Sequence, residues 1–429
     1  MDVLLRQLNK PHLKQADISP LIEHVSSFDF VDVKKAGDSF EGRPIHLLSM
    51  GNGKTKIFMW SQMHGDEATA TASVFDFIAM LETIPNWEKT YQIHIIPMVN
   101  PDGAERCTRQ NAQAIDINRD AVALQSPEAR LLRSTFDDIQ PDIALNLHDQ
   151  CPYYQVGKSG YPATMAFLAP TVDVEKTIPP TRKIAMGLIA KMLNAISPEI
   201  PNCIGRYDDT FSPRSFGDCF ASLGASTILI ESGAAANDPN RQIARRMNLL
   251  AMRQTIEHYP SLALQENIDN EMEVYFALPE IKAKTISSLL IENLQFAGTT
   301  SYQASVSIKQ TTRWSGQFYI DAVGDLSNLG GLINFDASEL TFEAGQVHSL
   351  EDHTVITDNN LQDWLKQGVI QFQGNDGLLD NQSSFTLLCN EPLSSSENAL
   401  ILNAPAYFLM RKDDAIVAAV LNGKLLVLE

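Results

Sequence analysis

The chain has 429 residues, of which 44% are hydrophobic, and it carries a formal net charge of −19 from 52 acidic and 33 basic residues. A chain this acidic repels phosphate backbones, and it contains no Lys/Arg-rich run, so its composition argues against a nucleic-acid partner. Its apolar runs are all shorter than the roughly 18–20 residues that span a bilayer, so we also expect no membrane partner.

The cysteines and the first residues of the chain indicate its compartment. The five cysteines are widely spaced and include no Cys-x-x-Cys pair, so the sequence suggests no disulfide framework. The first residues lack the basic region and long apolar core of a secretory signal. These features predict a reducing, cytoplasmic setting, and they leave the oligomeric state open.

Up to about residue 265, short apolar runs alternate with longer amphipathic segments. The apolar runs predict buried strands at 56–62, 92–99, 143–147, 165–170 and 226–232. The amphipathic segments predict helices at 68–84, 126–139, 182–196 and 238–259. Ser126-Pro127 and Asp238-Pro239 are typical of an N-cap followed by a first-turn proline. This alternation predicts an α/β fold with a mixed, mainly parallel sheet and helices on both faces.

After about residue 265 the helical periodicity fades, and Thr, Ser, Val, Gly and Asn become more frequent. The last residues, 406–429, predict a strand, an acidic turn and a hairpin with Asn422-Gly423 at its tip. We therefore predict a catalytic domain over 1–265 and a smaller β-rich accessory domain of unknown role over 266–429.

Two histidines and a glutamate follow predicted strands. His64 and Glu67, in HGDE, come directly after the strand at 56–62, and His148 comes directly after the strand at 143–147. Ligand sites gather at the carboxyl ends of the strands of an open α/β sheet. Two imidazoles and a carboxylate could hold a catalytic zinc ion there with one position left open. Satisfied, hydrogen-bonded core histidines are the alternative, and from these residues alone the two interpretations are about even.

Two further segments carry charges that need an explanation. The polar stretch 99–120 contains Arg106, Arg109, Asn118 and Arg119 in a chain that is short of bases, so it is either an anion-binding segment or a solvated loop. Glu231 ends the apolar strand at 226–232. It either emerges into solvent or faces the same crevice as a general base for an activated water.

Taken in order, these motifs resemble the zinc carboxypeptidase family, and more closely its bacterial members, over roughly residues 35–235. The resemblance rests on GDSFEGRPIHLLSMGNG (37–53), HGDE, NPDG, TRQN, DINRD, NLHDQ and ILIESG, which occur in the family's order. It implies a zinc-dependent metallopeptidase that binds one zinc ion per chain. The implied substrate is a peptide or small amide with a free carboxylate, and the implied reaction is hydrolysis of the C-terminal amide bond.

The resemblance also implies a role for each matching residue. His64, Glu67 and His148 would be the zinc ligands, and Asp116 would orient His64. Glu231 would be the catalytic glutamate, and Arg109 would stabilise the oxyanion. The substrate's terminal carboxylate would be bound by Asn118 and Arg119.

Departures from the family pattern leave some assignments open. Tyr207 is a candidate for the family's mobile substrate-binding tyrosine, but its surroundings match poorly, and an ordinary loop tyrosine is an equal alternative. The specificity pocket should lie near Arg214–Asp218, where the residue types do not select a substrate. Two other functions remain open: a zinc amidohydrolase of acylated amino acids, like the desuccinylase and aspartoacylase relatives, and a binding module that kept the fold without the activity.

Overall fold

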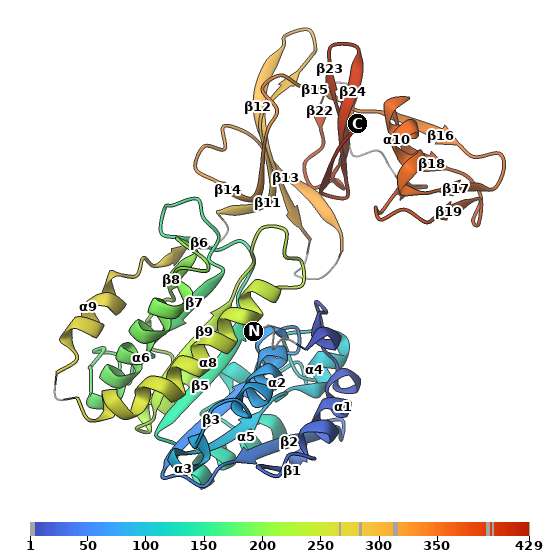
Figure 1. Cartoon of the computed structure of the whole chain (residues 1–429). Coiled ribbons are helices and arrows are strands. Elements are labelled where there is room, and N and C mark those ends of the chain that lie inside the picture. The colour runs from blue at the N-terminus through green and yellow to red at the C-terminus, as the bar shows by residue number, and fades with distance from the viewer. Residues whose placement is uncertain are drawn as a thin grey trace. The chain divides into compact units, whose positions relative to one another are not determined.

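The computed structural model describes residues 5–265, 267–282, 285–311, 316–391, 395–396 and 399–428 (Figure 1). Glu266, with which the predicted second domain begins, lies outside the described residues. Contacts divide the chain into two units. Unit 1 contains Met1–Ser159 and Ala163–Lys282, and unit 2 contains Gly160–Pro162 and Ala283–Glu429.

Unit 1 is built on one eight-stranded sheet with the strand order β1-β2-β4-β3-β5-β9-β7-β8. Its strands are β1 Val31–Asp38, β2 Pro44–Met50, β3 Thr55–Ser61, β4 Tyr91–Ile96, β5 Ile143–Asp149, β7 Met165–Leu168, β8 Ile204–Arg206 and β9 Ser226–Ser232. The central strands β4, β3, β5 and β9 run parallel. β1 pairs antiparallel with β2, and β2 pairs antiparallel with β4. β7 pairs antiparallel with β9 and parallel with β8. The predicted mixed, mainly parallel sheet is thereby confirmed. A short pair, β6 Gln155–Val156 with β10 Ile281–Lys282, lies outside this sheet.

Helices cover both faces of the sheet. Successive side chains of a strand point to opposite faces, and in the central strands both sets are apolar. On β3, Ile57 and Met59 enter one core with residues of α2, α6 and α8, whereas Phe58 and Trp60 enter the other core with residues of α5 and α7. These helices are α2 Thr69–Leu81, α5 Pro127–Ile139, α6 Pro180–Ile196, α7 Phe216–Ser222 and α8 Gln242–Ala263 (Figure 1). The remaining helices of unit 1 are α1 Gln15–Val25, α3 Trp87–Thr90, α4 Pro101–Arg106, α9 Asp269–Ala277 and the 3₁₀ turns η1 Arg6–Leu8 and η2 Ile117–Arg119.

Of the two predicted helix starts with a first-turn proline, the one at Pro127 is confirmed and the one at Pro239 is not. The Ser126 hydroxyl accepts a hydrogen bond from the backbone N–H of Ala129, with proline in the first turn of α5, as predicted. Asp238 accepts from the backbone N–H groups of Gln242 and Ile243, and α8 begins only at Gln242. The predicted start at Asp238-Pro239 was therefore several residues too early.

Unit 2 is rich in β-structure and contains one helix among its described residues, α10 Asp358–Lys366. Its main sheet has the order β13-β12-β11-β15-β23-β24-β25, with β14 also paired to β11. These strands are β11 Ile286–Phe296, β12 Tyr302–Gln310, β13 Phe318–Gly324, β14 Gly330–Asp336, β15 Thr341–Glu343, β23 Tyr407–Lys412, β24 Ala415–Leu421 and β25 Lys424–Val427. The smaller sheets contain β16 Gln346–Ser349, β17 Thr354–Ile356, β18 Val369–Gln373, β19 Leu379–Asn381, β20 Leu388–Cys389, β21 Ser395–Ser396 and β22 Ala399–Leu400.

The predicted C-terminal hairpin is confirmed. β24 and β25 pair antiparallel, and Asn422 and Gly423 between them have φ of 47° and 74°. Both values lie in the left-handed region that a tight hairpin turn requires. In the part of the chain that the structure describes, no helix combines the length and the apolar character needed to cross a membrane.

Candidate active site

The site lies where the parallel strands of unit 1 end. β3 ends at Ser61, and the turn that follows carries His64 and Glu67 to the start of α2. His148 lies at the end of β5, and it pairs in register with Glu231 of the neighbouring strand β9. Carboxyl ends of adjacent parallel strands meet at one edge, so residues far apart in the sequence come together here.

Gly65 shows how closely the turn of His64 approaches α4. A Cβ atom on Gly65 would lie 1.9 Å from the carbonyl carbon of Gly103 in α4, so only glycine fits. Asn100 caps α4 by accepting a hydrogen bond from the backbone N–H of Gly103, and its Nδ2 donates to the carbonyl of Met63. The segment NPDG therefore forms the start of a short helix that supports the loop of His64.

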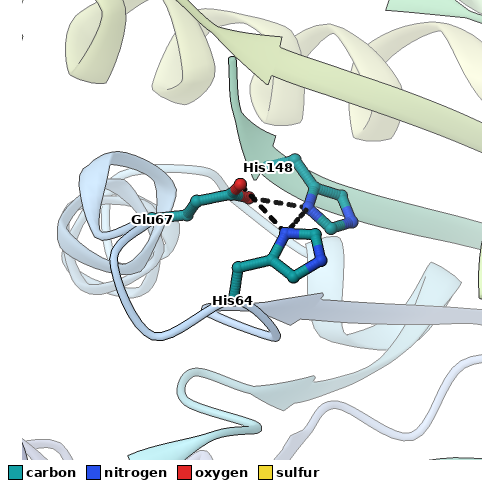
Figure 2. A group of neighbouring side chains, drawn as sticks. All are labelled: His64, Glu67 and His148. Atoms are coloured by element: carbon teal, nitrogen blue, oxygen red, sulfur yellow. Dashed lines mark hydrogen bonds and ion pairs between the residues drawn. The ribbon is translucent and has the colours of Figure 1, made fainter. Parts of the chain in front are cut away.

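Three side chains converge at this edge: His64, Glu67 and His148 (Figure 2). The two carboxylate oxygens of Glu67 lie 2.9 Å from Nδ1 of His64 and 2.7 Å from Nδ1 of His148. The two Nδ1 atoms are 3.2 Å apart. All three side chains are buried, and they are the only group of three or more potential ligand residues of this kind within the described ranges. Two nitrogen atoms and a carboxylate that share one small volume match the donor set of a zinc site.

The outer nitrogen atoms of the two imidazoles also have partners. Nε2 of His64 lies 3.1 Å from Oδ1 of Asp116, which also accepts a hydrogen bond from the backbone N–H of Asn118. Nε2 of His148 lies 3.4 Å from Nδ2 of Asn118. A carboxylate on the outer nitrogen fixes the orientation of a ligand imidazole. The structure therefore places the carboxylate of Asp116 against the outer nitrogen of His64.

Burial opposes ionisation of Glu67, but the charges of His64 and His148 hold the pKa of its carboxyl well below the ordinary value. Burial likewise acts against ionisation of Asp116, yet the hydrogen bond and charge of His64, together with Arg109, lower the pKa of this carboxyl. Both groups are therefore carboxylates at neutral pH, and the site offers negative charge to a cation.

Arg109 borders the cluster. Its Nη1 lies 3.2 Å from Nδ1 of His64 and 3.5 Å from a carboxylate oxygen of Glu67. Its Nε donates to Oδ2 of Asp116 at 3.1 Å, and its side chain is 39% exposed. Asp116 thus positions the guanidinium beside His64 and Glu67, and part of the guanidinium remains open to solvent.

Glu231, on β9, and Tyr207, which follows β8, lie close enough for the charge of the glutamate to act on the tyrosine. Glu231 is 8% exposed, so the strand does not simply release its carboxylate into solvent. The negative charge of Glu231, and then burial, raise the pKa of Tyr207 far above its ordinary value. The ring of Tyr154 lies 6.3 Å from that of Tyr207. The structure therefore places Tyr207 beside the glutamate, although sequence reasoning alone could not distinguish it from a loop tyrosine.

Asn118 and Arg119 belong to η2, and the structure places them differently. The Oδ1 atom of Asn118 accepts a hydrogen bond from the backbone N–H of Phe216, so this side chain joins η2 to α7. Arg119 is exposed, and its Nη1 donates to the carbonyl of Asn118 at 2.7 Å. Asn118 contacts the cluster of His64, Glu67 and His148 through His148, whereas the hydrogen bond of Arg119 stays within η2.

The segment expected to form the specificity pocket contains a structural carboxylate. Asp218 accepts hydrogen bonds from Ser215 Oγ, from the backbone N–H of Ser212 and from Thr171 Oγ1. Burial raises its pKa. Arg214 is exposed, and its carbonyl accepts from the backbone N–H of Ala121. Asp218 therefore holds the start of α7, and Arg214 is the charged side chain of the segment that remains open to solvent.

Sequence reasoning missed Asp149, the residue after His148. Its Oδ2 accepts hydrogen bonds from the backbone N–H and the hydroxyl of Thr69, and Nη1 of Arg241 lies 3.6 Å away. Its own backbone N–H donates to Glu67. Asp149 thereby ties the end of β5 to the start of α2. The only local signal for Asp149 was an acidic residue directly after a predicted metal-binding histidine. The residues that it contacts lie 80 or more positions away in the sequence.

Residues 22–162 match the family model of zinc carboxypeptidases. The chain resembles the zinc carboxypeptidases. This range contains the three convergent ligands, Arg109, Asp116, Asn118 and Arg119, whereas Tyr207 and Glu231 lie beyond it. Glu231 lies outside the matched range, and the pairing of β9 with β5 places it in register with His148.

Two relatives illustrate the similarity. Probable carboxypeptidase 2 of Arthroderma benhamiae is 30% identical over 125 residues, which are 26% of this chain and 24% of that protein. Carboxypeptidase 2 of Trichophyton tonsurans is 26% identical over 125 residues, 26% of this chain and 23% of that protein. The similarity thus spans about a quarter of the length of these relatives.

Solved structures of bacterial metallo-carboxypeptidases are similar over a larger share of the chain. The Burkholderia cenocepacia enzyme is 18% identical and covers 59% of this chain and 71% of its own, with a TM-score of 0.47. The Pseudomonas aeruginosa enzyme, solved in complex with (2-guanidinoethylmercapto)succinic acid, is 17% identical and covers 59% and 71%, with a TM-score of 0.46.

Proposed function

We propose that the protein is a zinc-dependent metallocarboxypeptidase that hydrolyses the C-terminal amide bond of peptides. The observation that carries this proposal is the convergence of His64, Glu67 and His148, with Glu231 in register with His148 on the adjacent strand. The match of residues 22–162 to the zinc carboxypeptidase family supports it.

The donor set fits zinc. Nδ1 of each histidine faces the carboxylate of Glu67, while the outer nitrogen of His64 contacts Asp116. Three protein ligands leave a coordination position open, as catalytic zinc sites require. A zinc ion bound there supplies Lewis acidity that activates water and polarises a carbonyl. We propose one ion per chain.

Glu231 would act as general base and then as general acid. Its carboxylate takes a proton from the attacking water and delivers it to the nitrogen of the departing amine. Arg109 would donate hydrogen bonds to the oxygen that gains negative charge, and losing one such donor typically costs about 10²–10³ in rate. Its anchorage by Asp116 supports this role, because a pre-positioned guanidinium needs little reorganisation during the reaction.

Asn118, Arg119 and Tyr207 would bind the substrate. The exposed guanidinium of Arg119 can bind a terminal carboxylate through two parallel hydrogen bonds, which places the last amide bond over the ligands. The hydroxyl of Tyr207 is protonated at neutral pH, and its raised pKa extends this state to higher pH, so it can donate to a bound peptide. The implied substrates are therefore peptides or small amides with a free carboxylate. The β-rich region from residue 266 is proposed as an accessory domain, and a cytoplasmic location stays a prediction.

The test is to measure the metal content of the purified protein together with amino-acid release from a peptide panel. The panel contains short peptides with free carboxyl ends, the same peptides with amidated ends, and N-acyl amino acids. We expect one zinc ion per chain and stepwise release from free carboxyl ends only. Zinc with cleavage of N-acyl amino acids but not peptides would replace the proposal with the amidohydrolase function. Protein that neither contains zinc nor gains activity when zinc is added would indicate a binding module.

A further inference from the structure

A second pair of reactive side chains lies outside the ligand cluster. Sγ of Cys107 is 3.0 Å from Nδ1 of His12, although the two residues are 95 positions apart. Cys107 follows the last residue of α4 in a left-handed conformation with φ of 53°, and His12 precedes α1. Both side chains are partly exposed, so small molecules in solution can reach them.

His12 can accept the proton of this thiol. Burial lowers the pKa of its imidazole, the negative charge of Asp66 acts in the opposite direction, and the charge of Lys14 lowers the pKa further. The net pKa is below the ordinary value, so the imidazole is uncharged at pH 7 and can accept a proton. A thiol within hydrogen-bond reach of such a base, with a carboxylate near the base, is the arrangement that activates cysteine nucleophiles.

Interactions from both sides hold the pair in place. Nε2 of Gln62 donates to the carbonyls of Leu13 and Gly65, which joins the residue after His12 to the turn that carries His64. Lys14, two residues after His12, forms an ion pair with Glu105 of α4 at 3.0 Å. The contact between His12 and Cys107 is therefore fixed by the packing of the N-terminal segment on α4.

Three other cysteines have a different environment. Burial raises the pKa of the thiols of Cys203, Cys219 and Cys389. A raised pKa leaves little thiolate at neutral pH, and the thiolate is the nucleophile. Cys389 is partly exposed, so it serves as an internal reference for a thiol without activation.

We propose that Cys107 is an activated thiol and a covalent modification site that reacts with low-molecular-weight disulfides, with His12 as its base. Nδ1 of His12 takes the proton from Sγ of Cys107, and the thiolate attacks one sulfur of the disulfide. The S–S bond of the disulfide breaks as the new S–S bond to Cys107 forms, and the other half leaves as a thiolate. Cys107 is thereby oxidised and the departing thiol is reduced. This site is independent of the proposed peptidase activity.

The experiment is to treat the full-length protein with oxidised glutathione at pH 7 and follow each cysteine by peptide mass spectrometry. We expect Cys107 to form the mixed disulfide at least about 10-fold faster than Cys389. His12→Gln should remove most of this difference, and the matched substitution His24→Gln, at an exposed position on α1, should leave it unchanged. Equal rates at Cys107 and Cys389, or a Cys107 rate that His12→Gln does not change, would overturn the proposal.

A second measurement needs no variant, so it remains decisive if His12→Gln fails to fold. The rate of modification of Cys107 is measured in the unaltered protein from pH 6 to pH 9. An ordinary thiol gains thiolate tenfold per pH unit up to its pKa of about 8.5. We expect the rate at Cys107 to rise less steeply and to level off at lower pH than the rate at Cys389. Parallel profiles for the two cysteines would contradict activation by His12.

Discussion

Glu231 is the residue on which the proposed chemistry most directly depends. It lies at the end of β9 in register with His148, and it is not one of the three convergent ligands. We predict that Glu231→Gln keeps its zinc ion but loses about 10²–10⁴-fold in kcat, because the amide cannot accept a proton. Metal analysis and peptide-release kinetics check this prediction. Glu257→Gln, on the solvent side of α8, is the matched control, and near-normal turnover in Glu231→Gln would exclude the general-base role.

Asp116 should act on the metal through His64. Its Oδ1 contacts Nε2 of His64, and its Oδ2 accepts from Arg109. We predict that Asp116→Asn weakens zinc affinity by roughly 10–100-fold, since a neutral partner makes the imidazole a poorer donor. Competition with a chelator of known affinity measures the effect. Asp137→Asn, on exposed α5 surface, should bind zinc normally, and equal affinities in the two variants would show that Asp116 does not orient the ligand.

Among the strands of unit 1, those that are buried on both faces could be predicted from the sequence. β3, β5 and β9 are continuous apolar runs because helices cover both of their faces, so their positions could be read directly. β1 alternates buried and exposed residues at the sheet edge, which leaves no such run. The antiparallel direction of β7 also leaves no local signal.

Some contacts of the candidate site could likewise be predicted from the sequence, and others could not. His64, Glu67 and His148 follow recognisable strands, so their convergence could be predicted from the rule that strand ends meet. The contacts of Asp149 with Thr69 and Arg241 could not be predicted, because they join residues 80 and more positions apart. Local sequence patterns carry no information about such pairings.

The close packing of the His64 turn on α4 leads to a prediction about folding stability and zinc binding. A methyl group on Gly65 would overlap the backbone of Gly103, so Gly65→Ala must push the turn away from α4. We predict a loss of roughly 1–3 kcal/mol in the free energy of unfolding, as for overpacking, together with weaker zinc binding. Denaturant titration and metal analysis measure the two effects. Gly298→Ala is the control, because its new methyl would meet only one atom, 3.8 Å away.

At the scale of the whole molecule, the two units differ in what they contribute to the proposed function. Each has its own hydrophobic cores, so each has the packing expected of a domain. Every proposed ligand, catalytic and substrate-binding residue lies in unit 1, as does the pair of Cys107 and His12. The family match ends at residue 162, which is also the last residue of the short segment Gly160–Pro162 that belongs to unit 2.

The free energy of unfolding should depend on pH partly through the protonation of His94, which lies on β4. Burial, with the nearby charges of Lys56 and Lys34, lowers its pKa from 6.5 to about 4, and its Nδ1 is hydrogen-bonded to Ser49. The unfolded chain therefore binds a proton that the folded chain does not, between these two values. The stabilisation by neutral His94 is fully present above about pH 6.5 and is lost as the pH falls towards 4.

We predict that His94→Gln removes up to roughly 3 kcal/mol of the decrease in unfolding free energy between pH 7 and pH 4, because glutamine does not titrate. Urea titrations at pH 7, 6, 5 and 4 measure this difference against the unaltered protein. The carboxylates contribute equally to both, so they cancel in the comparison. His24→Gln, at an exposed position, should keep the original slope. If His94→Gln also keeps it, the acid sensitivity of the fold arises elsewhere than at the buried histidine of β4.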